Sequence, residues 1–182
     1  MNVRQTAGKG LMFLFIAQLL VLGSLLPIVG ILIALAALVL SLYAFYTLSS
    51  AGEQYKNAFT LTIIVLVISI VEIFAGDGFL SAILDIATSI INLIVVFYVC
   101  NGTADLLRGI DDGLVNRAGL IWKMYMICTI VMIICEFLVL IPIINIIAGF
   151  TAVIILIVQF VASILYLLFL WSSQKVLQSS YF

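Results

Sequence analysis

The stretch INLIVVFYVCNGTADLLRGIDDGLVNRAGLIWKMYMICTI, residues 91–130, consists of an apolar run, a short charged segment and a second apolar run. This alternation continues in both directions, so that the chain of 182 residues contains six apolar runs. Only 8% of its residues are charged and its mean hydropathy is +1.44, whereas roughly 25% of the residues of soluble domains are charged. The sequence therefore predicts an integral membrane protein.

The lengths of the apolar runs predict helices. A helix needs about 20 residues to cross the hydrocarbon core of a bilayer. We expect an all-α fold, one membrane domain over residues 1–182, with six spans at about 10–26, 28–49, 58–75, 79–100, 119–140 and 148–172. Glycine and proline interrupt the apolar sequence at Gly23 to Pro27, Gly76 to Gly78 and Pro142 to Gly149. These breaks predict three consecutive antiparallel hairpins with very short outer turns.

The basic residues define an orientation. The chain contains seven of them, which are Arg4, Lys9, Lys56, Arg108, Arg117, Lys123 and Lys175. Every second connection lacks a cation, as expected when one membrane face collects the positive charge. The net charge is then about +3 on this side and −4 on the other. We predict cytoplasmic N- and C-termini in a plasma membrane of bacterial type.

The longest inner connection, residues 101–118, interleaves apolar with charged residues. This pattern is typical of an amphipathic helix on the membrane surface. We expect such a helix to begin at Thr103 as its cap and to break near Gly113.

Acidic residues collect on the opposite side without any basic partner in the sequence. An ionisable group inside a span is by default a hypothesis of function, because its burial is costly. We predict a candidate polar or ion site that consists of Glu72, Asp77, Asp85, Thr88, Asn92 and Glu136. Convergence of these groups would form an outer vestibule suited to a cation, a proton or an amine-bearing solute. The alternative is that the acids lie at the interface and only mark helix ends.

Small residues recur in the second predicted span at helical spacing. They are Gly30, Ala34, Ala37, Ser41 and Ala44. Such a stripe lies on one helix face and allows another helix to approach closely. We interpret it as a helix-packing seam. The alternative is docking of a partner helix, from another membrane protein or from a second copy of the chain.

Several chemistries are excluded by residues that the sequence lacks. Without histidine there is no imidazole base, no histidine-ligated metal and no Ser-His-Asp triad. Cys100, Cys128 and Cys135 show no C-x-x-C spacing, and no glycine-rich phosphate loop is present. A basic patch for nucleic acid is absent as well. We therefore expect no enzyme, no cofactor, no metal site and no nucleic-acid partner; the expected surroundings are a lipid bilayer.

In size, span count and predicted cytoplasmic termini, the chain resembles the substrate-binding subunits of energy-coupling-factor vitamin transporters. The resemblance covers the architecture of the whole chain but no motif. Those subunits carry a small-residue docking motif in the first span, whereas the stripe here lies in the second. Because no site is recognisable, our first prediction is an interaction or accessory subunit of the membrane. The alternative is a transport or solute-binding subunit that uses the acidic vestibule.

Overall fold

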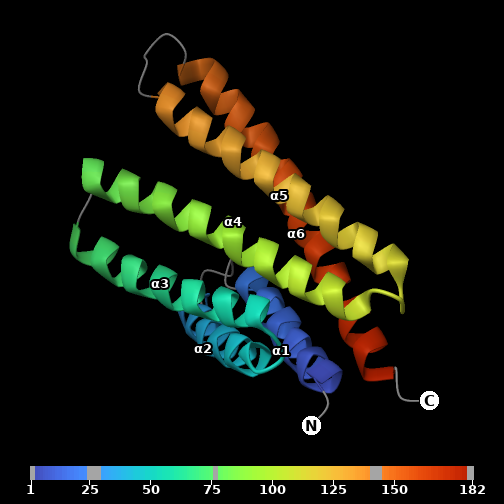
Figure 1. The fold of residues 1–182 in the computed structure, drawn as a ribbon. Helices are drawn as coiled ribbons and strands as arrows, with labels where there is room; N and C mark the ends of the chain where they lie inside the picture. The colour runs from blue at the N-terminus through green and yellow to red at the C-terminus, as the bar shows by residue number, and fades with distance from the viewer. Residues whose placement is uncertain (1–2, 24–29, 76–77, 140–144, 180–182) are drawn as a thin grey trace.

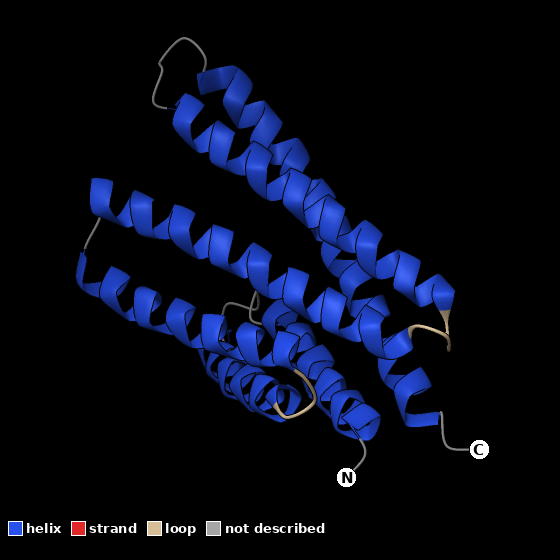
Figure 2. Ribbon diagram, viewed as in Figure 1, coloured by secondary structure: helices blue, strands red, loops and turns tan. Residues whose placement is uncertain are grey.

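The computed structural model describes residues 3–23, 30–75, 78–139 and 145–179. These residues form helices and no strand (Figure 2). The helices are α1 (Val3–Gly23), α2 (Gly30–Ser49), α3 (Glu53–Ala75), α4 (Phe79–Leu107), α5 (Asp112–Val139) and α6 (Asn145–Ser179). All six are long and apolar enough to cross a membrane. The predicted all-α fold with six spans is confirmed.

The helices form a closed ring. Each helix contacts its neighbours along the chain, and α1 also contacts α6. The pairs α1 and α2, α3 and α4, and α5 and α6 form the three predicted hairpins. The start of α1 and the end of α6 lie at the same end of the bundle as the α2–α3 and α4–α5 connections (Figure 1). We call this half of the bundle the terminal half and the opposite half the distal half.

The buried core is concentrated in the terminal half and the middle of the bundle. The largest of its fully buried side chains are Tyr55, Phe169, Leu11, Leu14, Leu48, Leu107, Leu170 and Leu177. In the distal half, α4 and α5 diverge toward their distal ends (Figure 1). Phe74 and Phe150, near distal helix ends, are 85% and 72% exposed. In a bilayer these apolar side chains contact lipid rather than protein, so protein packing holds the helices together mainly in the terminal half.

Two glycines allow close helix contacts in this core. A Cβ atom on Gly10 of α1 would lie 2.6 Å from Cγ of Leu48 in α2. A Cβ atom on Gly102 of α4 would lie 3.2 Å from Cζ of Tyr55 in α3. Close approach at small residues increases van der Waals contact, which is a main source of helix association in lipid. Neither glycine belongs to the small-residue stripe predicted from the sequence.

The connection between α4 and α5 differs from the prediction. No separate surface helix forms over residues 101–118, because α4 continues to Leu107 and α5 begins at Asp112. Thr103 lies inside α4 and is fully buried, and Leu107 and Leu114 belong to the core. The ends of two helices can place their apolar residues in the core and their charged residues outside. This gives the same alternating sequence pattern as an amphipathic helix on a membrane surface. The connection is therefore the short segment 108–111.

This short connection has local features that explain where the helices end. Gly109 adopts φ +76°, a left-handed conformation that glycine tolerates without steric cost. Asp111 then accepts a hydrogen bond from the backbone N–H of Leu114 through Oδ1, at 3.0 Å. That bond satisfies one of the free N–H groups at the start of α5. Gly113, which we expected to break a helix, lies in the first turn of α5.

The helices also extend beyond the predicted spans. Helix α1 begins at Val3 rather than near residue 10, and α6 runs from Asn145 to Ser179 rather than over residues 148–172. The predicted spans ended where polar residues begin. The helices instead continue through these polar residues into the interface region of the membrane. Lys175 Nζ, for example, lies 4.6 Å from the ring centroid of Trp171. A long side chain can pack in this way while its charge reaches water.

Candidate functional site

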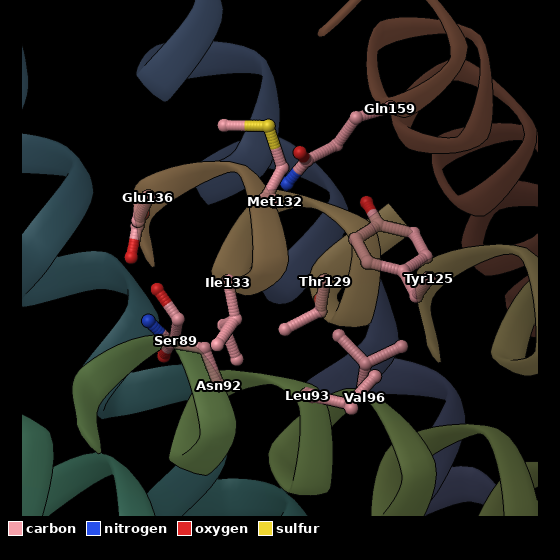
Figure 3. A pocket seen from close by; sticks show the side chains of 10 residues that line it. All are labelled: Ser89, Asn92, Leu93, Val96, Tyr125, Thr129, Met132, Ile133, Glu136 and Gln159. Atoms are coloured by element: carbon pink, nitrogen blue, oxygen red, sulfur yellow. The ribbon is translucent and has the colours of Figure 1, made fainter. Parts of the chain in front are cut away.

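A polar cavity lies between α4, α5 and α6 in the distal half. Its volume is about 220 Å³. It is lined by Ser89, Asn92, Leu93, Val96, Tyr125, Thr129, Met132, Ile133, Glu136 and Gln159. We call it the distal cavity (Figure 3). Its volume is sufficient for several water molecules or for one small solute.

Helix α5 supplies one wall of the distal cavity. Tyr125, Thr129, Met132 and Glu136 follow each other at steps of four, three and four residues, which places them on one helix face. Figure 3 shows the carboxyl group of Glu136 pointing toward Asn92 of α4. The cavity thus has a carboxyl group and a carboxamide on opposite helices near its distal end.

A hydrogen-bonded tyrosine lines the end of the cavity nearest the core. The Tyr125 hydroxyl donates to Oγ of Ser163 in α6 at 3.0 Å. Ser163 in turn donates to the backbone carbonyl oxygen of Gln159 at 2.9 Å. These two bonds fix the orientation of the Tyr125 ring between α5 and α6. Its hydroxyl therefore has a defined position beside α6.

Three of the predicted acidic residues lie on neighbouring helices in the distal half. Glu72 of α3 and Asp85 of α4 lie near each other on the two helices of one hairpin. Asp85 also interacts electrostatically with Glu136 of α5. Asp77 lies outside the described residues. Two carboxyl groups in contact repel each other when both are charged, unless a proton or a cation lies between them.

The other predicted polar residues differ in position. Asn92 lines the distal cavity, whereas Thr88 and Asp85 do not belong to its lining. The Thr88 hydroxyl oxygen is buried and has no hydrogen-bond partner within the described part of the chain. The acidic residues and the cavity therefore form neighbouring parts of one polar region, and Glu136 belongs to both.

The charge of this region is not balanced by basic residues. The seven Lys and Arg residues all lie in the terminal half, in the parts of the helices there or in the α4–α5 connection. The ion pair that joins Arg108 to Asp105, at 3.4 Å, also lies there. Uncompensated carboxyl groups at the rim of a cavity create a field that attracts cations. Within the described residues, no three His, Cys, Asp or Glu side chains are placed to hold a metal ion.

The small-residue stripe of α2 does not belong to the lining of the distal cavity. Ala37 and Ala44 are buried, and Ala34, Ala37 and Ser41 line a second cavity of about 290 Å³. Thr62 and Ser69 of α3 lie on its other side. Gly30 begins α2. The stripe thus packs inside the chain at Ala37 and Ala44. At Ala34 and Ser41 it borders the second cavity, which is an open groove between α2 and α3.

Of the residues that line the distal cavity, the site predicted from the sequence contained only Asn92 and Glu136. Tyr125, whose hydroxyl bonds to α6, is among those that it did not contain. The spacing of Tyr125 from Thr129 and Glu136 was the available signal for a shared helix face. The partner of Tyr125, Ser163, lies 38 residues away. No pattern within one helix predicts such a contact.

The comparisons with other proteins give no family. No protein-family model, no curated protein and no solved structure matches this chain.

Proposed function

We propose that this protein is a membrane subunit that binds, and in a complex or alone transports, a small cationic solute in the distal cavity. The observation that carries the proposal is the position of Glu136 in the lining of a polar cavity, with Asp85 and Glu72 on the neighbouring helices α4 and α3. A group of carboxyl groups in a membrane is costly unless a bound cation, a proton or water stabilises it. Contributions from three different helices distinguish this arrangement from residues that only mark a helix end.

The lining of the cavity limits the solute. Small-molecule pockets for drug-sized ligands enclose about 300–1,000 Å³, so a cavity of about 220 Å³ fits a smaller solute. Glu136 offers an acceptor for a positive group, and Asn92 and Gln159 offer carboxamides that donate and accept. A compact ammonium or guanidinium compound matches this combination.

The proposed orientation follows from the charges. The terminal half carries all seven basic residues, so the positive-inside rule assigns it to the cytoplasm. The distal cavity then faces the outside of a plasma membrane of bacterial type. Binding and transport also agree with a non-catalytic role, since the chain contains no histidine to act as a general base.

Binding is tested with the purified full-length chain in mild detergent. Thermal unfolding is followed in the presence of methylammonium, guanidinium or rubidium chloride, against sodium chloride at equal ionic strength. We expect at least one of the three probes to raise the unfolding temperature. The triple variant E72Q/D85N/E136Q should lose this increase. The control variant E53Q, at the start of α3 in the terminal half, should retain it.

Two results would overturn the proposal. One is an unfolding temperature that none of the three probes changes relative to sodium. The other is an equal increase in the wild type and in the triple variant, because binding would then be independent of the three carboxyl groups.

A second candidate function is that of an interaction subunit, as the sequence first suggested. The groove between α2 and α3 favours it, because small side chains at Ala34 and Ser41 leave room for a further helix. The partner is another membrane protein or a second copy of the chain. Native mass spectrometry after gentle purification tests this function, and a monomer without bound protein would count against it.

A further inference from the structure

The distal cavity is elongated along the helix axes. On α5 its lining extends from Glu136, in the last turn of the helix, to Tyr125. These two positions are about 16 Å apart along the axis, at 1.5 Å per residue. One leaflet contributes about half of a hydrocarbon core that is about 30 Å thick. A cavity of about 220 Å³ that extends over the depth of one leaflet is long and narrow.

One side of the cavity lies at the outer surface of the ring of helices. Within the described residues, only α4, α5 and α6 line it. The hydrogen bond from Tyr125 to Ser163 joins α5 to α6, whereas α4 and α5 diverge toward their distal ends (Figure 1). Because α4 and α5 are neighbours in the ring, the gap between them has one side on the outside of the bundle. In a bilayer that side faces lipid rather than water.

The edges of the gap between α4 and α5 are apolar and exposed. Ile90 of α4 is 43% exposed and Phe137 of α5 is 58% exposed. Each directly follows a lining residue, Ser89 on α4 and Glu136 on α5. Lipid chains therefore contact both helices right beside the cavity. An apolar chain can extend from the bilayer into the gap without leaving an apolar surrounding.

Charged and apolar groups are ordered along the cavity as they are in an amphiphile. Glu136, near the distal end of α5, lies at the level where lipid head groups begin. Deeper in the membrane, Leu93 of α4 and Ile133 of α5 contribute apolar surface to the lining (Figure 3). The Tyr125 hydroxyl already donates its proton to α6. The deep part of the cavity therefore accepts an alkyl chain, and the distal part accepts a positive group.

We propose that the distal cavity binds a single-chain amphiphile of the outer leaflet, with an ammonium or guanidinium head at Glu136 and an alkyl chain in the gap between α4 and α5. The inference rests on the proposed function, since the head is the cation assigned there, and it adds the chain and a sideways entry from the lipid. Anionic amphiphiles are repelled, because the carboxyl groups of the distal half have no basic partner among the described residues.

The test uses the full-length chain in phosphatidylcholine liposomes. The probe is dodecylammonium with a photoreactive diazirine near the end of its chain, and mass spectrometry of the digested protein locates the cross-links. We expect cross-links in the segments 93–96 of α4 and 125–133 of α5. They should clearly exceed those at Ile157, a lipid-exposed residue of α6. The same chain with a hydroxyl group in place of the ammonium should label all three segments alike.

Variants test the contribution of the carboxyl group. E136Q should lower the labelling of α4 and α5 about tenfold, as expected when a hydrogen bond to a charged group is weakened. The control E53Q, in the terminal half, should leave it unchanged. Excess methylammonium outside the liposomes should also reduce this labelling, because both compounds place a cation at the same carboxyl group. If E136Q does not fold, S89F replaces it, since a phenyl ring at this lining position fills the narrow cavity.

The inference fails if the ammonium probe labels Ile157 as strongly as the α4 and α5 segments. It also fails if the hydroxyl probe labels these segments equally well, or if neither E136Q nor S89F lowers the labelling. Thermal unfolding with methylammonium decides the proposed function separately. An increase in unfolding temperature that requires the three carboxyl groups, together with uniform labelling, would retain the cation site and reject the alkyl chain.

Discussion

The hydroxyl groups of Tyr55 and Thr103 form a hydrogen bond of 2.9 Å that joins the beginning of α3 to the end of α4. Both side chains are completely or almost completely buried. In the same place Gly102 allows the Tyr55 ring to lie against the backbone of α4. A polar contact inside an apolar core fixes the relative position of two helices, because each hydroxyl loses its partner if the helices slide.

Removal of one hydroxyl from this pair should destabilise the protein. In T103V the Tyr55 hydroxyl stays buried and loses its partner, so we expect a loss of about 1–3 kcal/mol in the free energy of unfolding. The measurement is reversible unfolding in mixed micelles of increasing denaturing detergent, followed by circular dichroism. The double variant Y55F/T103V should lose less than the sum of the single variants. Simple additivity would show that the two hydroxyl groups do not interact.

The two close glycine contacts should tolerate no added methyl group. In G10A the new Cβ would lie 2.6 Å from Cγ of Leu48, so α1 and α2 must shift. We expect the free energy of unfolding to fall by about 1–3 kcal/mol, the usual cost of overpacking. G119A is the matched control, because a Cβ at Gly119 of α5 meets no atom within 4 Å. Its unfolding free energy should equal or exceed that of the wild type, since alanine favours helix over glycine.

The small-residue stripe of α2 should respond differently at neighbouring positions. Ala37 is 1% exposed, so A37L should destabilise the protein by about 1–3 kcal/mol. Ala34 is exposed and borders the groove between α2 and α3, so A34L should fold with near-normal stability. Unfolding in mixed micelles compares the two variants. Equal stability of A37L and A34L would contradict the different burial of these side chains.

The proposed orientation predicts which cysteine substitutions react from each side of the membrane. Asp112 and Gly78 are both exposed and lie at opposite ends of the bundle. A membrane-impermeant maleimide added to intact cells should label G78C and not D112C, whereas inverted vesicles should give the opposite result. The native Cys100, Cys128 and Cys135 are buried and should not react in the folded protein. Labelling of D112C in intact cells would reverse the orientation.

The sequence was sufficient to predict the six spans and their pairing. The hydrophobic runs and breaks determine six spans and three hairpins, because each adjacent pair must turn within a few residues. The helical spacing also placed the acidic residues of α3, α4 and α5 near the same end of the bundle. The proximity of Glu72 to Asp85 and of Asp85 to Glu136 follows from the rotation of each helix. A single sequence does not determine that rotation.

Contacts between distant parts of the chain were not predictable. Tyr125 bonds to Ser163 at a separation of 38 residues, and Tyr55 bonds to Thr103 at a separation of 48 residues. The periodicity of each helix indicates a buried face but not the residue that faces it. The prediction of a surface helix at residues 101–118 was wrong for a related reason. Leu107 and Leu114 had the spacing of a surface helix, and only their burial in the core distinguishes the two structures.

The concentration of the core in the terminal half has a consequence for how the membrane acts on the protein. The distal parts of α4 and α5 diverge (Figure 1), and the distal cavity lies in the spacing between these two helices and α6. Lipid surrounds these helix segments, so the lateral pressure and thickness of one bilayer leaflet act on that spacing. The opposite leaflet surrounds a densely packed base that resists compression. The two leaflets of an asymmetric bilayer therefore influence the site unequally.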